Sequence, residues 1–78
     1  MEEKYLFIEV HGNVVICNSI YSNLEIAKET LHSAFDYFIN DSHKLEYGKD
    51  CWEADDRMSA WAIFNGIDSV WTIIKTLR

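Results

Sequence analysis

Residues 58–77 read Met-Ser-Ala-Trp-Ala-Ile-Phe-Asn-Gly-Ile-Asp-Ser-Val-Trp-Thr-Ile-Ile-Lys-Thr-Leu, and this stretch decides the fold. Asn65-Gly66 stands between two runs rich in β-branched and aromatic residues, which is the strongest short-range signal for a β-hairpin. A two-residue loop and a four-residue loop differ by two residues in register, so both orient the side chains of the two strands in the same way. Either loop places on one face Ala60, Ala62, Phe64, Trp71 and Ile73. Because small alanines beside a large tryptophan leave room, we expect a helix to lie over this face.

A helix is predicted to begin at Ser22. The run Ser22-Asn23-Leu24-Glu25 fits a capping box, in which the serine hydroxyl accepts from the Glu25 amide. Apolar residues then recur at helical spacing and form one stripe, which consists of Leu24, Ala27, Leu31, Ala34, Phe35 and Phe38. The polar run 40–42 is expected to end the helix.

Residues 4–20 predict a second hairpin, in which His11-Gly12-Asn13 separates two β-like runs. A three-residue loop would pair Val10 with Val14. That register gathers on one apolar face Leu6, Ile8, Val10, Val14, Ile16 and Ile20. A two-residue loop would shift the pairing by one and mix the faces, so the three-residue loop is preferred.

The segment between helix and second hairpin is harder to interpret. Residues 43–47 alternate well enough for a short strand that Gly48 would end, and residues 49–57 are expected to form a loop or one helical turn. The order ββα(β)ββ predicts a single α+β domain over residues 1–78. We expect two layers, with one long helix packed on one face of a mainly antiparallel sheet of four to five strands.

Charge and composition exclude several classes of protein. The 78 residues hold 13 Asp and Glu against 7 Lys and Arg, a net charge of −6, which argues against direct binding of nucleic acid or anionic membranes. A hydrophobic fraction of 49% is too high for a disordered chain. Cys17 and Cys51 are too few for a disulfide framework, and no secretory or membrane-spanning pattern is present. We therefore expect a cytoplasmic protein with free thiols.

Residues that could carry chemistry are present without a recognised spacing. Cys51, His43 and the carboxylates Asp50, Asp55 and Asp56 offer a nucleophile, a base and acids, but no known catalytic arrangement. The histidines and cysteines are scattered singly, unlike the paired ligands of zinc sites. The three glycines lie far apart and make no phosphate cradle. We expect no catalytic residue, no metal site and no cofactor.

The candidate site is the acidic and aromatic stretch 46–56. It reads either as a solvated loop or as an interaction surface formed by Glu46, Tyr47, Asp50, Trp52, Glu53, Asp55 and Asp56. Aromatic anchors rimmed by carboxylates suit a basic, nucleic-acid-binding groove on another protein, because carboxylates can occupy the places of phosphates.

Both faces of the predicted sheet are apolar, although one helix covers only one of them. Leu6, Ile8 and Val10 alternate with Tyr5 and Phe7 in the first strand, and the second hairpin shows the same pattern. An apolar face left to water favours self-association or a protein partner, so a homodimer is expected.

In its size, acidity and ββα(β)ββ order, the whole chain resembles small accessory proteins encoded by bacteriophages and prophages, among them anti-CRISPR and other anti-defence inhibitors. This resemblance implies a non-enzymatic inhibitor, acting as a DNA mimic in the bacterial cytoplasm. Its partner would be a bacterial defence protein such as a Cas nuclease or effector complex, whose nucleic-acid path it would block.

Two alternatives stay open. The first is a homo-oligomer that sequesters a small molecule or nucleotide through the clustered cations Lys44, Lys49, Arg57 and Arg78. The second, ranked lower, is a small enzyme that uses Cys51 or a carboxylate pair.

Overall fold

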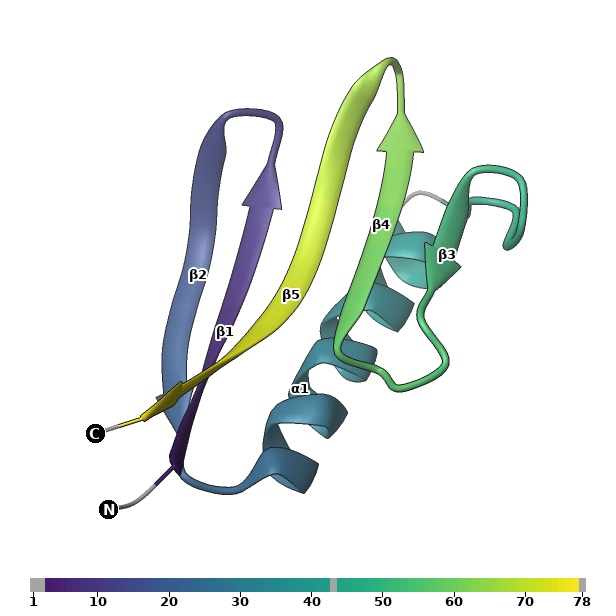
Figure 1. The fold of residues 1–78 in the computed structure, drawn as a ribbon. Helices are drawn as coiled ribbons and strands as arrows, with labels where there is room; N and C mark the ends of the chain where they lie inside the picture. The colour runs from purple at the N-terminus through teal and green to yellow at the C-terminus, as the bar shows by residue number, and fades with distance from the viewer. Residues whose placement is uncertain (1–2, 43, 78) are drawn as a thin grey trace.

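The structure is a computed structural model that describes residues 3–42 and 44–77. Five strands form one antiparallel sheet in the order β2-β1-β5-β4-β3, and the helix α1 crosses one face of this sheet (Figure 1). The predicted two-layer α+β fold is therefore confirmed. The elements are β1 Glu3–His11, β2 Val14–Tyr21, α1 Leu24–Asp36, the π-helical turn η1 Tyr37–Ser42, β3 Cys51–Glu53, β4 Ser59–Phe64 and β5 Ile67–Leu77.

The hairpin of β4 and β5 forms as its sequence predicts. Phe64 pairs with Ile67, so Asn65 and Gly66 are the two loop residues, and both take the positive φ angles that such a turn requires. Ala60 lies directly opposite Trp71. The apolar side chains buried on the helix side of this hairpin are Ala60, Ala62, Trp71 and Ile73, and Ser69 is a buried polar side chain on the same side. Phe64, which was predicted on this face, is half-buried.

Trp71 is the centre of the core, and no part of it is exposed to solvent. The ring of Phe35 lies 5.4 Å from it and the ring of Phe38 5.1 Å, both at steep angles that favour edge-to-face contact. At about 25 cal/mol per Å² of buried apolar surface, one buried tryptophan contributes roughly 4–6 kcal/mol to folding. The space left by Ala60 and Ala62 is thus filled by the helix.

The register of the first hairpin differs from the preferred one. His11 pairs with Val14 and Val10 with Val15, and a bulge leaves Ile16 without a partner on β1. The loop is the two residues 12 and 13, not three. Phe7 is buried under α1 beside Ile73, its partner on β5, so the odd-numbered residues of β1 face the helix. The apolar alternation was misleading because both faces of β1 are apolar.

The opposite face of the sheet carries no helix, and we call it the open face. It contains Leu6, Ile8 and Val10 as expected, but not Val14, which pairs with the helix-facing His11. The open face is completed by alternate residues of the other strands, including Ile20, Trp61, Val70 and Ile74.

The helix begins one residue later than the capping box predicts. Asn23 is the N-cap, and its side-chain oxygen accepts from the N–H groups of Glu25 at 2.8 Å and Ile26 at 3.2 Å. The carboxamide of Asn23 thus takes the role assigned to Ser22. The apolar stripe packs on the sheet as predicted, with Ala27, Leu31 and Phe35 fully buried, and the helical path ends at Ser42 through η1.

The strand predicted over residues 43–47 does not form in residues 44–47, and His43 lies outside the described residues. The N–H of Leu45 instead donates to the carbonyl of Ile39, and residues 46–50 make a turn. Residues 51–53, which were expected to belong to a loop or a helical turn, instead form the strand β3 and pair with β4. In the described part of the chain, neither helical segment has the length and apolar character that a membrane-spanning helix needs.

Candidate functional site

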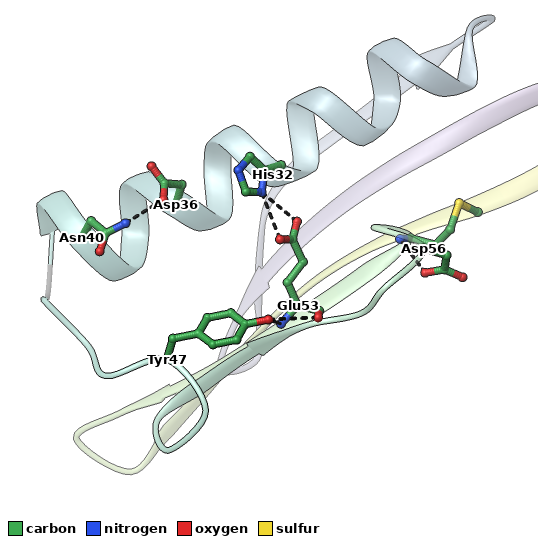
Figure 2. A network of polar contacts seen from close by, with 7 residues as sticks. His32, Asp36, Asn40, Tyr47, Glu53 and Asp56 are labelled. Carbon is green, nitrogen blue, oxygen red and sulfur yellow. Dashed lines mark hydrogen bonds and ion pairs between the residues drawn. The ribbon is translucent and has the colours of Figure 1, made fainter.

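The edge strand β3 positions two aromatic side chains. Tyr47 and Trp52 stack with ring centroids 5.7 Å apart, and about half of each residue is exposed. The Tyr47 hydroxyl donates to the carbonyl of Glu53 and accepts from its N–H, at 3.2 and 3.1 Å (Figure 2). The ring of Tyr47 also makes an edge-to-face contact with the ring of Phe35 in the core. Both predicted anchors therefore lie together in fixed positions at the surface.

Glu53 points away from this surface. Both of its carboxylate oxygens lie 3.0 Å from Nδ1 of His32 on α1, and its side chain is only 11% exposed (Figure 2). The sequence prediction grouped Glu53 with the exposed carboxylates, whereas the structure uses it to connect β3 to the helix. Its charge is not presented to a partner.

The turns on either side of β3 hold the remaining predicted carboxylates. Asp50, which is half-buried, accepts the N–H of Glu46 at 3.2 Å, and Asp56 accepts the N–H of Met58 at 2.9 Å. Glu46, Asp55 and Asp56 are exposed. These local hydrogen bonds fix the chain and thereby the positions of the charges.

Two further carboxylates join the site from the helix. Glu29 and Asp36 are exposed, and they lie one turn before and one turn after His32, which faces β3. Asp36 also accepts a hydrogen bond from the Asn40 side chain at 2.6 Å (Figure 2). No pattern in the sequence connects these two helix residues with residues 46–56.

We call this surface the acidic edge. It consists of the Tyr47–Trp52 stack, the carboxylates Glu46, Asp55 and Asp56 in the turns that flank β3, and the carboxylates Glu29 and Asp36 on α1, one turn on either side of His32. Lys49 and Arg57 are exposed in the same turns. The carboxylates outnumber these cations, so the edge offers acceptors for a basic surface and includes a few donors of its own. The cations expected to form a nucleotide site are not clustered: Lys44 precedes the turn 46–50, Lys49 lies within it and Arg57 follows β3. Arg78 is outside the described residues.

Cys51 is fully buried under the helix. Burial raises the pKa of its thiol, the charge of Asp50 raises it further, and a backbone hydrogen bond from Gly48 lowers it in part. A protonated, inaccessible thiol is a poor nucleophile, so the hypothesis of an enzyme based on Cys51 loses its reactive group. Both cysteines are free. Residues 3–42 and 44–77 bring together no metal-binding group of three or more His, Cys, Asp or Glu side chains.

A second polar cluster connects β1 to β5 on the helix side of the sheet, and no pattern in the sequence indicates it. His11 Nδ1 lies 2.8 Å from Ser69 Oγ, and His11 Nε2 lies 2.7 Å from a carboxylate oxygen of Glu9. The cluster borders a hollow of about 240 Å³ lined by His11, Phe38, Phe64, Ile67 and Ser69. With Nε2–H donating to Glu9, Nδ1 is free to accept the Ser69 hydroxyl.

Comparison of the chain with protein-family models, with curated proteins and with solved structures finds no match. The function must therefore be argued from the site itself.

Proposed function

We propose that the chain is a non-enzymatic binding protein that inhibits a bacterial defence system. In this proposal its acidic edge docks on the basic, nucleic-acid-binding surface of a defence protein, such as a Cas nuclease or effector complex, in the bacterial cytoplasm. The observation that carries the proposal is the exposed Tyr47–Trp52 stack at β3, with exposed carboxylates in the turns that flank β3 and on the helix α1 that is bonded to it.

The chemistry of the edge suits a surface built for phosphates. Carboxylates accept charge-assisted hydrogen bonds from arginine and lysine as phosphate oxygens do, and tyrosine and tryptophan are frequent anchors of protein interfaces. The bonds of Tyr47 to Glu53 and of Asp56 to Met58 order the edge before any partner arrives. Less conformational entropy is then lost on binding, which favours affinity.

The test is capture from a bacterial lysate that contains a CRISPR–Cas system and has been treated with nuclease, so that nucleic acid cannot bridge the proteins. We expect the immobilised chain to retain a nucleic-acid-binding defence protein at low salt and to release it when duplex DNA is added. Retention of no such protein, or of one that DNA does not displace, would overturn the proposal.

The cluster of Glu9, His11 and Ser69 favours a second candidate function, hydrolysis of an ester. A carboxylate, an imidazole and a hydroxyl stand in the order of a catalytic triad beside the apolar hollow. Ser69 Oγ would attack the ester carbonyl carbon and pass its proton to His11 Nδ1. The alcohol would leave with that proton, and water would then cleave the acyl-serine to restore the hydroxyl.

Two features weaken this candidate against the first. Ser69 is only 2% exposed, and the N–H of Gly12, which follows His11, already donates to the carbonyl of Asp68 at 2.7 Å and cannot stabilise an oxyanion. Hydrolysis of p-nitrophenyl butyrate by the wild type and by Ser69→Ala decides the matter. Activity that requires Ser69 supports the enzyme, and equal rates in the two proteins remove it.

A further inference from the structure

Apolar side chains cross the open face in one continuous row. Trp52 of β3 is opposite Trp61, Trp61 is opposite Val70, Val70 is opposite Val10, and Val10 is opposite Val15 of β2. The row thus spans all five strands, or about 19 Å at 4.8 Å per strand. Trp52 is 47% exposed and Trp61 41%. Scattered exposed apolar residues are normal on a protein surface, whereas a contiguous apolar patch such as this one marks an interaction surface.

A second apolar row lies along the same face, where Ile74 is opposite Leu6 and Leu6 is opposite Ile20. Ile20 and Ile74 are both well exposed. Between these two rows runs a mixed row, in which Ile8 lies between Asn18 and Thr72. The apolar residues are therefore spread over a broad area of the face and do not form a narrow groove for a peptide.

The charge on the open face is low, although the whole chain carries −6. Among the side chains that the structure describes, strand alternation places two charged groups there, Lys4 near one end and Asp68 near the other. The remaining charges lie on the helix side and in the turns. A strongly charged partner would find no counterpart on this face, whereas a second copy of the chain would not be repelled from it.

The size of the face fits an interface between two chains. The molecule measures 42 by 24 by 17 Å. A face of the two longer dimensions is on the order of 1,000 Å², close to the roughly 800 Å² that each partner buries in a stable interface of standard size.

The face also holds both a projection and a depression, as an interface between identical surfaces requires. A shallow hollow of about 300 Å³ is lined by residues of β4 and β5, chiefly Trp61, Ile63, Asp68 and Val70. Trp52 stands beside it on the neighbouring strand β3. An indole is the type of side chain that most often fills such a hollow at the centre of an interface.

We infer that the chain forms a homodimer in which the open faces of two copies pack together, with Trp52 of each copy seated in the hollow of the other. The result is a four-layer arrangement of helix, sheet, sheet and helix. The carboxylates of both acidic edges stay outside this interface, whereas Trp52 belongs to both surfaces. A copy that uses Trp52 to hold the defence protein is therefore expected to be monomeric, but the dimer is tested without any partner, so each proposal can fail alone.

Sedimentation equilibrium over a series from about 1 µM to about 500 µM tests the dimer, since association depends on concentration. We expect a mass near twice 9.1 kDa at the upper end. Trp61→Lys should return the mass to that of one chain. The matched control is Ile26→Lys, which also places a lysine at an exposed isoleucine, but on α1, and should leave the dimer intact.

Tryptophan emission of the wild type gives a second measurement that needs no folded variant. Because Trp71 is buried in either state, a blue shift on raising the concentration reports Trp52 and Trp61. A wild type that stays monomeric without a shift overturns the inference. So does a dimer that survives Trp61→Lys or is lost in Ile26→Lys. If the monomer instead binds a different protein through Trp61, the open face serves that partner and a second copy is excluded.

Discussion

Nδ1 of His32 lies 3.0 Å from both carboxylate oxygens of Glu53, so the middle of α1 is bonded to the edge strand β3. This contact holds α1, which carries the acidic-edge residues Glu29 and Asp36, beside β3 and its turns. Figure 2 shows the His32 side chain of the helix pointing to Glu53 of β3. The acidic edge therefore depends on a contact between residues that are 21 positions apart in the chain.

A double-mutant cycle of His32→Ala and Glu53→Gln should show a coupling of about 0.5–1 kcal/mol in the free energy of unfolding, because one partner is mostly buried and the other partly exposed. Urea denaturation of the four proteins measures it. The exposed pair of Asp36 and Asn40 on the same helix is the control, with an expected coupling of about 0.3 kcal/mol or less. Strict additivity at His32 and Glu53 would contradict the proposed connection.

Ala60→Leu should lower the free energy of unfolding by about 1–3 kcal/mol, because Ala60 lies opposite Trp71 under the helix and the added methylenes have no space. Ser59→Leu, one residue earlier and on the exposed side, should change it by about 0.5 kcal/mol or less. Denaturation followed by circular dichroism compares the two variants. Equal losses of unfolding free energy in the two variants would show that the packing of the helix does not require a small residue at position 60.

The buried thiol predicts a dependence of stability on alkaline pH. Because the pKa of Cys51 is raised above its ordinary value of 9.0, the folded chain keeps this proton at pH values where the unfolded chain has lost it. The stabilising contribution is complete below about pH 9 and decreases as the pH rises toward the folded pKa.

Comparison of two cysteine variants checks this dependence. The free energy of unfolding of Cys17→Ala should fall between about pH 8.5 and pH 10 as steeply as that of the wild type, and that of Cys51→Ala should fall less. Equal slopes in all three proteins would mean that Cys51 is not protected by burial.

Neutralising the acidic edge should weaken the complex with the captured defence protein mainly through the association rate. Asp55→Asn with Asp56→Asn removes two charges and keeps a side-chain oxygen that can accept the Met58 N–H. We expect the association rate constant at low salt to fall about tenfold, with a smaller change in the dissociation rate. The matched control, Glu25→Gln with Asp68→Asn, removes two exposed charges outside the acidic edge. Surface plasmon resonance should show it near the wild type, and equal losses would indicate a response to net charge alone.

The second hairpin and the helix were predictable because local chemistry decides both. Asn65-Gly66 fixes the loop, and the alternation of Ala60 and Ala62 with Trp61 shows which side has room for the helix. The register of the first hairpin was not predictable, since both faces of β1 are apolar and the bulge at Ile16 leaves no mark in the sequence. The burial of Phe7 against Ile73 determines which face of β1 lies under the helix, and this contact joins segments that are distant in the sequence.

The candidate site was predicted only in part, because some of its features depend on local sequence and others on contacts between distant segments. The types and positions of Tyr47, Trp52 and Asp55 marked an exposed surface, and the structure stacks the two rings there. The inward turn of Glu53 depends on His32, which only the tertiary fold brings near. The strand β3 itself is three residues long and exists through its pairing with β4, so no local pattern could reveal it.

The most direct test of the central claim is whether the captured defence protein can bind DNA while it holds this chain. Fluorescence anisotropy of a labelled duplex, titrated with the defence protein, measures this at a saturating concentration of wild-type chain. We expect the wild type and the Glu25→Gln, Asp68→Asn control to abolish the rise in anisotropy, whereas the Asp55→Asn, Asp56→Asn variant at the same concentration restores it in part. A ternary complex, with DNA binding unchanged by bound wild-type chain, would overturn the proposed function.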